Sequence, residues 1–183
     1  MHHFLEGKSV YLREFKKEDY ALISKALSHP EIRKMTGSQK YLTAAKIEKA
    51  YDGFALDNRM DLVIVDKETD EPVGDLSLNE IDHLNQNANL RIALHEPRFF
   101  GKGYGTEALR LIMEYGFFTL NLYRIGLCVY SYNARAKKSY EKLGFQIEGV
   151  IRGELYYDNE YHDNIMMGVL KEEFMEATKN LKT

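Results

Sequence analysis

The chain has 183 residues, of which 44% are hydrophobic and 29% charged, a balance typical of a folded domain rather than a disordered chain. Its 25 Lys and Arg against 28 Asp and Glu give a net charge of −3, which argues against a nucleic-acid binder. No apolar run reaches the roughly 18 residues of a membrane span. Met1–Glu6 shows no signal peptide, and the single Cys128 fits a reducing compartment. We therefore expect one cytoplasmic domain, residues 1–183, with no nucleic-acid or membrane partner.

The first third of the chain predicts one strand followed by helices. Val10–Glu14 alternates like a strand, and Asp19–Leu27 has the apolar spacing of a helix. A short helix follows Pro30 and ends near Gly37, and Thr43 can cap a third helix. The inward face of that third helix would hold Ile47, Tyr51, Phe54 and Ala55.

The middle of the chain predicts an antiparallel meander. Its three strands are Leu62–Val65, Val73–Ile81 and Ala88–Leu94, with polar turns between them. A loop then leads to a helix from about Thr106 to Leu120 and to a strand at Ile125–Tyr130.

The last third predicts a helix, two strands and a C-terminal helix. Asn133 can cap the first helix, and Gly144 can end it in the left-handed conformation. The strands lie near Phe145–Ile151 and Tyr161–Leu170, and the second of them can pair in a homodimer if it is exposed. The order of all these elements predicts an α/β fold with a mixed sheet.

Three alternating glycines precede the helix predicted from Thr106. They are Gly101, Gly103 and Gly105. Glycines let backbone N–H groups approach an anion closely, and a helix N-terminus adds its dipole, so the loop suits a pyrophosphate. A dinucleotide loop would need an acid roughly 20 residues later, and none lies between Glu114 and Glu141. Pro97–Lys142 also carries a net charge of +5, which suits a polyanionic ligand, while the rest of the chain carries −8.

Two segments resemble the GNAT superfamily of acetyl-CoA-dependent N-acetyltransferases. Phe100–Gly105 is similar to the family's Q/R-x-x-G-x-G/A loop in the register counted from Pro97, with Phe100 where Arg or Gln is usual. Arg98–Gly103 matches the same pattern literally in a second register. Asn133–Phe145 is similar to the family segment N-x-x-A-x-x-x-Y-x-x-x-G-F.

The resemblance implies a central mixed, mainly antiparallel sheet flanked by helices. It also implies an enzyme that moves an acetyl group from acetyl-CoA directly to a primary amine, with Asn133 touching the pantetheine arm and Tyr140 beside the thioester sulfur. The residues implied to bind acetyl-CoA are Ile92, Ala93, Leu94, Phe100, Gly101, Lys102, Gly103, Tyr104, Gly105, Thr106, Asn133, Arg135 and Tyr140. Arg135, Lys137 and Lys138 can reach its 3′-phosphate.

The transfer needs a proton donor for the thiolate and a base for the amine. Tyr140 suits the first role, since a phenol has a pKa near ~10. The base is open among Glu80, Asp82, Glu154, His83 and His95, and we place Glu80 first. No metal site is expected, because the six histidines lack metal-ligand spacing. Cys128, between apolar neighbours, is expected to be a small core residue.

The sequence leaves the acceptor open. The chain resembles both ribosomal-protein N-terminal acetyltransferases and spermidine acetyltransferases, the latter through Glu80–Leu84 and Tyr115–Tyr123. However, Lys34–Tyr41 is basic where the spermidine branch is acidic, and Asn89 stands where an acid is common. We therefore expect a monoamine or a peptide N-terminus, held near acidic residues, with spermidine as the alternative. A non-catalytic CoA-binding sensor is the alternative of another class.

Overall fold

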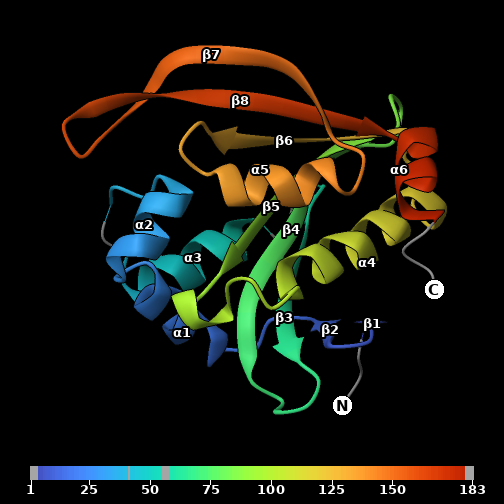
Figure 1. The fold of residues 1–183 in the computed structure, drawn as a ribbon. Coiled ribbons are helices and arrows are strands. Elements are labelled where there is room, and N and C mark those ends of the chain that lie inside the picture. The colour runs from blue at the N-terminus through green and yellow to red at the C-terminus, as the bar shows by residue number, and fades with distance from the viewer. Residues whose placement is uncertain (1–3, 41, 55–57, 180–183) are drawn as a thin grey trace.

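One mixed sheet organises the structure, a computed structural model that describes residues 4–40, 42–54 and 58–179. Its eight strands in the described ranges follow the order β1-β2-β3-β4-β5-β6-β8-β7 (Figure 1). Only β5 and β6 pair in parallel, which confirms the predicted mixed, mainly antiparallel sheet flanked by helices. The strands are β1 Leu5–Glu6, β2 Val10–Arg13, β3 Met60–Asp66, β4 Pro72–Asp82, β5 Asn87–Leu94, β6 Arg124–Tyr130, β7 Gln146–Tyr157 and β8 Glu160–Leu170.

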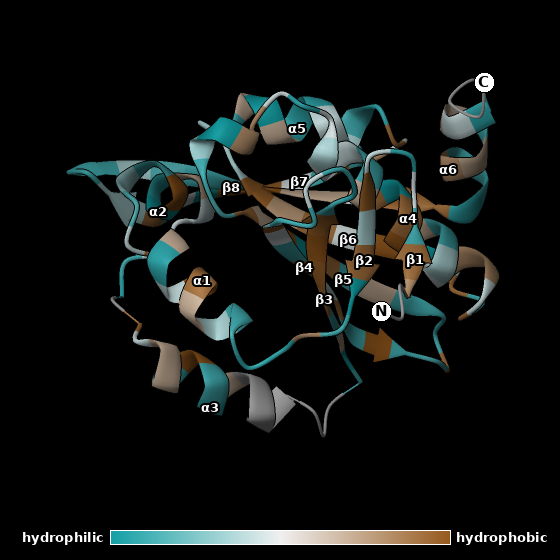
Figure 2. Cartoon of the chain, turned by 90° about the horizontal axis from the view of Figure 1, so that it is seen from below, coloured by the Kyte–Doolittle hydropathy of each residue, from teal (hydrophilic) through white to brown (hydrophobic). Residues whose placement is uncertain are grey.

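Helices cover both faces of the sheet, with α5 on one side and α1 and α3 on the other (Figure 2). The helices are α1 Asp19–Ala26, α2 Pro30–Thr36, α3 Ala44–Phe54, α4 Tyr104–Phe118, α5 Ala134–Glu141 and α6 Lys171–Thr178. None of these helices is long and apolar enough to cross a membrane, as far as the described residues reach. The face predicted for the third helix is only partly visible: Ile47 is buried, the side chains of Tyr51 and Phe54 are not described, and Ala55 lies outside the described residues.

The main core lies between the sheet and α4. Leu76 and Leu78 of β4 are fully buried because alternate side chains of a strand share a face, and Ile112 and Phe117 of α4 pack onto them. Burying each such side chain contributes about 1.5–3 kcal/mol. Phe174 of α6 meets Phe117 at a centroid distance of 5.2 Å, which fastens the C-terminal helix to α4.

The glycine loop sets where α4 begins. The sequence predicts a start near Thr106, but the helix begins at Tyr104, because Gly103 adopts a left-handed φ of 86° and takes the N-cap position. Ahead of it, Pro97–Phe99 forms one short 3₁₀ turn. Gly144 ends α5 with a φ of 94°, as predicted from the sequence.

The last two strands differ from the prediction. They form a long hairpin closed by Asp158 and Asn159, both at left-handed φ values of 56° and 63°, the geometry of a two-residue hairpin turn. Because this turn folds β7 and β8 against each other and β8 pairs with β6 along its length, β8 lies inside the sheet. Pairing of the last strand in a homodimer depended on that strand being exposed. β8 is not an edge strand, so this condition is not met, whereas β7 lies at one edge of the sheet. The short strand β1 was not predicted.

Candidate active site

A cavity opens where β5 and β6 separate. The parallel pairing of these strands is confined to Asn87–Asn89 and Arg124–Gly126, and β5 continues to Leu94 without β6 beside it. The cavity has a volume of about 920 Å³. We call its two parts the glycine end, formed by Gly101, Gly103–Thr106 and α5, and the arginine end, formed by Arg91, Cys128, Tyr130 and α2.

The glycine end presents bare backbone. Gly101 and Gly103 both have left-handed φ values, and a Cβ atom added to either would meet nothing within 4 Å. Gly103 caps α4 without a side-chain hydrogen bond, and the first N–H groups of a helix have no acceptor within the helix itself. The space that side chains would fill is thus bordered by amide donors and the positive end of a 15-residue helix, which suits a phosphate group.

Cations of α5, and Lys142 directly after it, border the same space. The guanidinium carbon of Arg135 lies 3.6 Å from the centroid of the Phe100 ring, so Phe100 supports a cation at the position where the family usually has Arg or Gln. Lys138 and Lys142 also line the cavity. Lys102 does not line it, and Lys137 forms an ion pair with Glu141 on the surface of α5.

Asn133 joins the two ends of the cavity. Its Oδ1 accepts a hydrogen bond from the amide of Ala136 at 3.2 Å, the N-cap contact predicted from the sequence. Its Nδ2 donates to the carbonyl of Met35 at 3.4 Å, and the Tyr132 hydroxyl donates to the carbonyl of Lys34. These contacts hold α2 against the start of α5 and so fix the position of α2 in the cavity wall.

Tyr140 comes from the last turn of α5 and lines the cavity with its ring nearly buried, 8% exposed. It packs edge-to-face on Phe145 at a centroid distance of 5.9 Å. Burial raises the pKa of Tyr140 to about 12, because a phenolate would lose its hydration there. At neutral pH the hydroxyl is therefore protonated, which is the form that a proton donor needs, although the raised pKa makes it a weaker acid than an exposed tyrosine.

The candidate carboxylates lie outside the wall. Glu80 is exposed, at a left-handed φ of 51° where the β4–β5 register shifts, and accepts a hydrogen bond from Asn89, which does line the cavity. Asp82 is used in a turn, accepting from the amides of Leu84 and Asn85. Glu154 accepts from the side chain of Asn164 beside Cys128. In the described part of the chain, no Asp or Glu belongs to the lining.

Cys128 is the clearest correction. The prediction of a core residue is wrong, since Cys128 is exposed and lines the cavity. Strand alternation turns Leu127 and Val129 into the core and Cys128 to the other face, which β5 has left uncovered. Partial burial first, and then the charge of Glu154, raise the pKa of this thiol, so it is a weak nucleophile at neutral pH.

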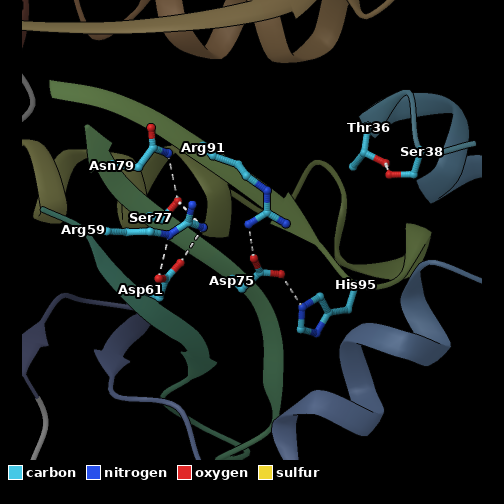
Figure 3. Close-up of polar contacts among 9 residues, drawn as sticks. All are labelled: Thr36, Ser38, Arg59, Asp61, Asp75, Ser77, Asn79, Arg91 and His95. Atoms are coloured by element: carbon cyan, nitrogen blue, oxygen red, sulfur yellow. Dashed lines mark hydrogen bonds and ion pairs between the residues drawn. The ribbon is translucent and has the colours of Figure 1, made fainter. Parts of the chain in front are cut away.

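An ion network behind the arginine end was missed by the sequence reasoning. Asp75 of β4 accepts from Arg91 Nη1 at 2.6 Å and bonds His95 Nε2 at 2.9 Å (Figure 3). Burial alone would raise the pKa of Asp75, but the charge of Arg91 and the hydrogen bond of His95 outweigh it and hold this pKa well below its usual range. Asp75, Ser77 and Asn79 alternate with leucines in the sequence, and this alternation could have indicated a polar face on this strand.

The two histidines considered as bases lie away from the cavity. His95 is buried against Asp75, and its Nδ1 has no hydrogen-bond partner among the described residues. His83 is exposed in the β4–β5 turn. Within the described ranges, no three His, Cys, Asp or Glu side chains gather as metal ligands would.

Comparison with known proteins decides the family. The model of the acetyltransferase (GNAT) domain matches residues 9–146. The chain belongs to the GNAT acetyltransferase family. The resemblance inferred from the sequence is thereby confirmed, and the chain is an acyltransferase that uses acetyl-CoA as co-substrate. The open backbone at Gly101 and Gly103 and the cations of α5 suit the phosphates of that co-substrate.

Relatives share most of the length of this GNAT protein. Spermidine N(1)-acetyltransferase of Escherichia coli K12 is 29% identical over 171 residues, covering 93% of this chain and 91% of the relative. An uncharacterized N-acetyltransferase p20 of Bacillus licheniformis is 31% identical, covering 89% and 93%. The crystal structure of spermidine N-acetyltransferase from Vibrio cholerae with CoA and spermine has a TM-score of 0.83 at 26% identity, covering 91% of this chain and 98% of that one.

Proposed function

We propose that residues 1–183 act as one domain that transfers the acetyl group of acetyl-CoA directly to a primary amine inside the cavity between β5 and β6. The observation that carries the proposal is that this one cavity borders both the open backbone of Gly103 and the hydroxyl-bearing ring of Tyr140. Acetyl-CoA would enter at the glycine end, against Ile92–Leu94 and Phe100–Thr106. The amine would approach from the arginine end.

The residues have distinct parts in this transfer. The unprotonated amine nitrogen forms a bond to the acetyl carbon of the thioester, and the carbon–sulfur bond breaks. Tyr140 gives its proton to the leaving sulfur and regains one from water. The proton that the amine loses passes through water, and Glu80, beside Asn89 at the rim, is the carboxylate placed to take it. A backbone N–H of β5, past its last pairing with β6, can hold the carbonyl oxygen.

The charge of the wall favours a monoamine or a peptide N-terminus as acceptor. Arg91, Arg135, Lys138 and Lys142 line the cavity, and no carboxylate of the described residues does. A polyamine carries several positive charges, so this lining repels it. Glu80 and Glu154 contribute to the acidic surface expected from the chain's charge, but both lie outside the described lining of the cavity.

Spermidine is the second candidate, and the relatives support it. Full-length similarity to spermidine acetyltransferases from two bacteria, one of them solved with spermine, favours a polyamine acceptor for this chain too. The specificity constants for spermidine, a monoamine and a short peptide at fixed salt separate the candidates. An advantage of spermidine beyond roughly tenfold, about 1.4 kcal/mol in transition-state binding, would overturn our preference.

Location and assembly are part of the same proposal. The chain has a single cysteine, Cys128, whose free thiol lies in the cavity, and this suits the reducing cytoplasm. A homodimer would form along β7, one of the two edge strands of the sheet in the described residues, where Ile147, Val150 and Ile151 are 40–51% exposed.

A further inference from the structure

The cavity reaches both faces of the sheet between β5 and β6. Leu127 and Val129 of β6 are buried in the core that includes α4, so alternation puts Cys128 and Tyr130 on the opposite face. All four residues line the cavity. Tyr130 therefore borders the part of the cavity proposed for the acceptor, on the face opposite α4 and its phosphate-binding backbone.

The ring of Tyr130 is fixed by two neighbours. It stacks on Tyr132, with ring centroids 5.8 Å apart and planes 18° apart. It also packs against the backbone of Gly37, since a Cβ atom added to Gly37 would lie 2.4 Å from Tyr130 Cε2. Gly37 ends α2 at a left-handed φ of 64°, so a glycine here both caps the helix and leaves room for the ring. The ring is thus held in place before an acceptor binds.

Apolar side chains surround this ring. Ile32 and Met35 of α2 line the cavity with Tyr130 and Cys128. Burial first, and then the charge of Glu154, raise the pKa of the Tyr130 hydroxyl, so the ring is uncharged at neutral pH. This part of the wall suits an apolar group, whose removal from water favours binding.

The polar side chains beside the ring are engaged with other groups of the protein. The Thr36 hydroxyl bonds the Ser38 hydroxyl at 2.7 Å (Figure 3). Asn89 donates to Glu80, and Arg91 is held in its ion pair with Asp75. An apolar group can therefore bind against the ring while these contacts stay intact.

We propose that Tyr130 is a specificity-determining residue that packs on an apolar group of the acceptor, with Gly37 as the positioning residue of its ring. The preferred acceptor is then a primary amine on an aromatic or large aliphatic body, either a free arylalkylamine or a peptide whose first residue is apolar. This inference rests on the proposed amine acetylation and names the acceptor class.

The test compares primary amines that differ in the apolar group alone. The specificity constant is measured for phenethylamine and for ethylamine, at matched concentrations of neutral amine, with the wild type, Tyr130→Ala and the control Tyr123→Ala. Tyr123 is 53% exposed and lies outside the cavity lining. A peptide that begins with phenylalanine and one that begins with glycine form the second arm, which distinguishes the two sources of the apolar group.

We expect the wild type and Tyr123→Ala to prefer the aromatic member in at least one arm by about 10- to 100-fold. Tyr130→Ala should remove about tenfold or more of that preference, while KM for acetyl-CoA and the specificity constant for the smaller amine stay within about threefold of the wild type. Tyr130→Phe should keep the preference, because the ring and not the hydroxyl makes the contact.

Gly37→Ala tests the positioning of the ring. The added Cβ enters the space of the ring, so this variant should raise KM for the aromatic acceptor and leave kcat for the smaller amine unchanged. Thermal unfolding of each variant is the check on folding.

Two results would overturn the inference. One is a wild type that acetylates both members of each pair equally, and the other is a Tyr130→Ala variant that keeps the full preference or loses activity equally on both members. If no amine is acetylated by the wild type although acetyl-CoA binds, the proposed function itself has failed, which is a different result.

Discussion

The glycine end and the arginine end of the cavity are built in different ways. The glycine end comes from short continuous segments, Gly101–Thr106 and Asn133–Tyr140, whose backbone geometry follows from local sequence. The arginine end joins β5, β6 and α2, and the ion pair behind it links Arg91 to Asp75 of the neighbouring strand β4. The segments that carry the family motifs are therefore local in the sequence, whereas the Asp75–Arg91 contact exists only because the fold pairs β4 with β5.

The largest expected effect is at the glycine end. Tyr140→Phe removes one hydroxyl and keeps the ring on Phe145, so we expect unchanged folding and CoA affinity but a kcat about 10² to 10⁴ lower. Steady-state kinetics and calorimetry measure the two quantities. Tyr115→Phe, on α4 and outside the cavity lining, is the matched control. A Tyr140→Phe variant that turns over at wild-type speed would make Tyr140 a packing residue and water the proton donor.

The backbone of the glycine loop gives the next largest effect. Gly103→Val fills the space that now holds no atom within 4 Å of a Cβ, so CoA should bind about 10- to 100-fold more weakly, as the loss of one or two charge-assisted hydrogen bonds would cause. Gly153→Val controls for backbone strain, because Gly153 also has a left-handed φ and lies on β7. Calorimetric affinities that fall equally in both variants would remove the loop from the binding site.

The buried carboxylate of Asp75, behind the arginine end, should contribute to the free energy of unfolding in a pH-dependent way. Asp75 has a folded pKa below the unfolded value of about 3.9, so its charge stabilises the fold above that pH, and the contribution fades as the pH falls toward the folded pKa. Asp75→Asn should lower the free energy of unfolding by about 1–3 kcal/mol at neutral pH, and by less below about pH 4. Urea unfolding of this variant and of the exposed Glu160→Gln gives the comparison. A deficit that stays constant with pH would contradict the ionic role.

Much of the fold was predictable because periodicity is local. The meander and the order of the main elements follow from periodicity, and the capping roles of Asn133 and Gly144 follow from residue type. Cys128 was predicted to be a core residue because its neighbours are apolar. Those neighbours do not reveal that β5 stops pairing with β6 after Asn89, which leaves Cys128 exposed. The edge position of β7 also depends on which neighbour β8 pairs with, a long-range choice.

The residues of the candidate site also fall into those that the sequence predicts and those that only the fold brings together. Most residues assigned to acetyl-CoA line the cavity, because the motifs carry them together, whereas Lys102 and Lys137 do not. Arg91 and Asp75 are 16 positions apart, and no local pattern states that they meet.

Free CoA thiol, followed in time with and without a primary amine, tests the central claim of direct transfer most directly. We predict that the wild type releases thiol only when amine is present, in equal amount to the N-acetylated product, and that Cys128→Ala does the same. A burst of one thiol per enzyme without amine, absent from Cys128→Ala, would instead show an acyl-cysteine route and contradict the account.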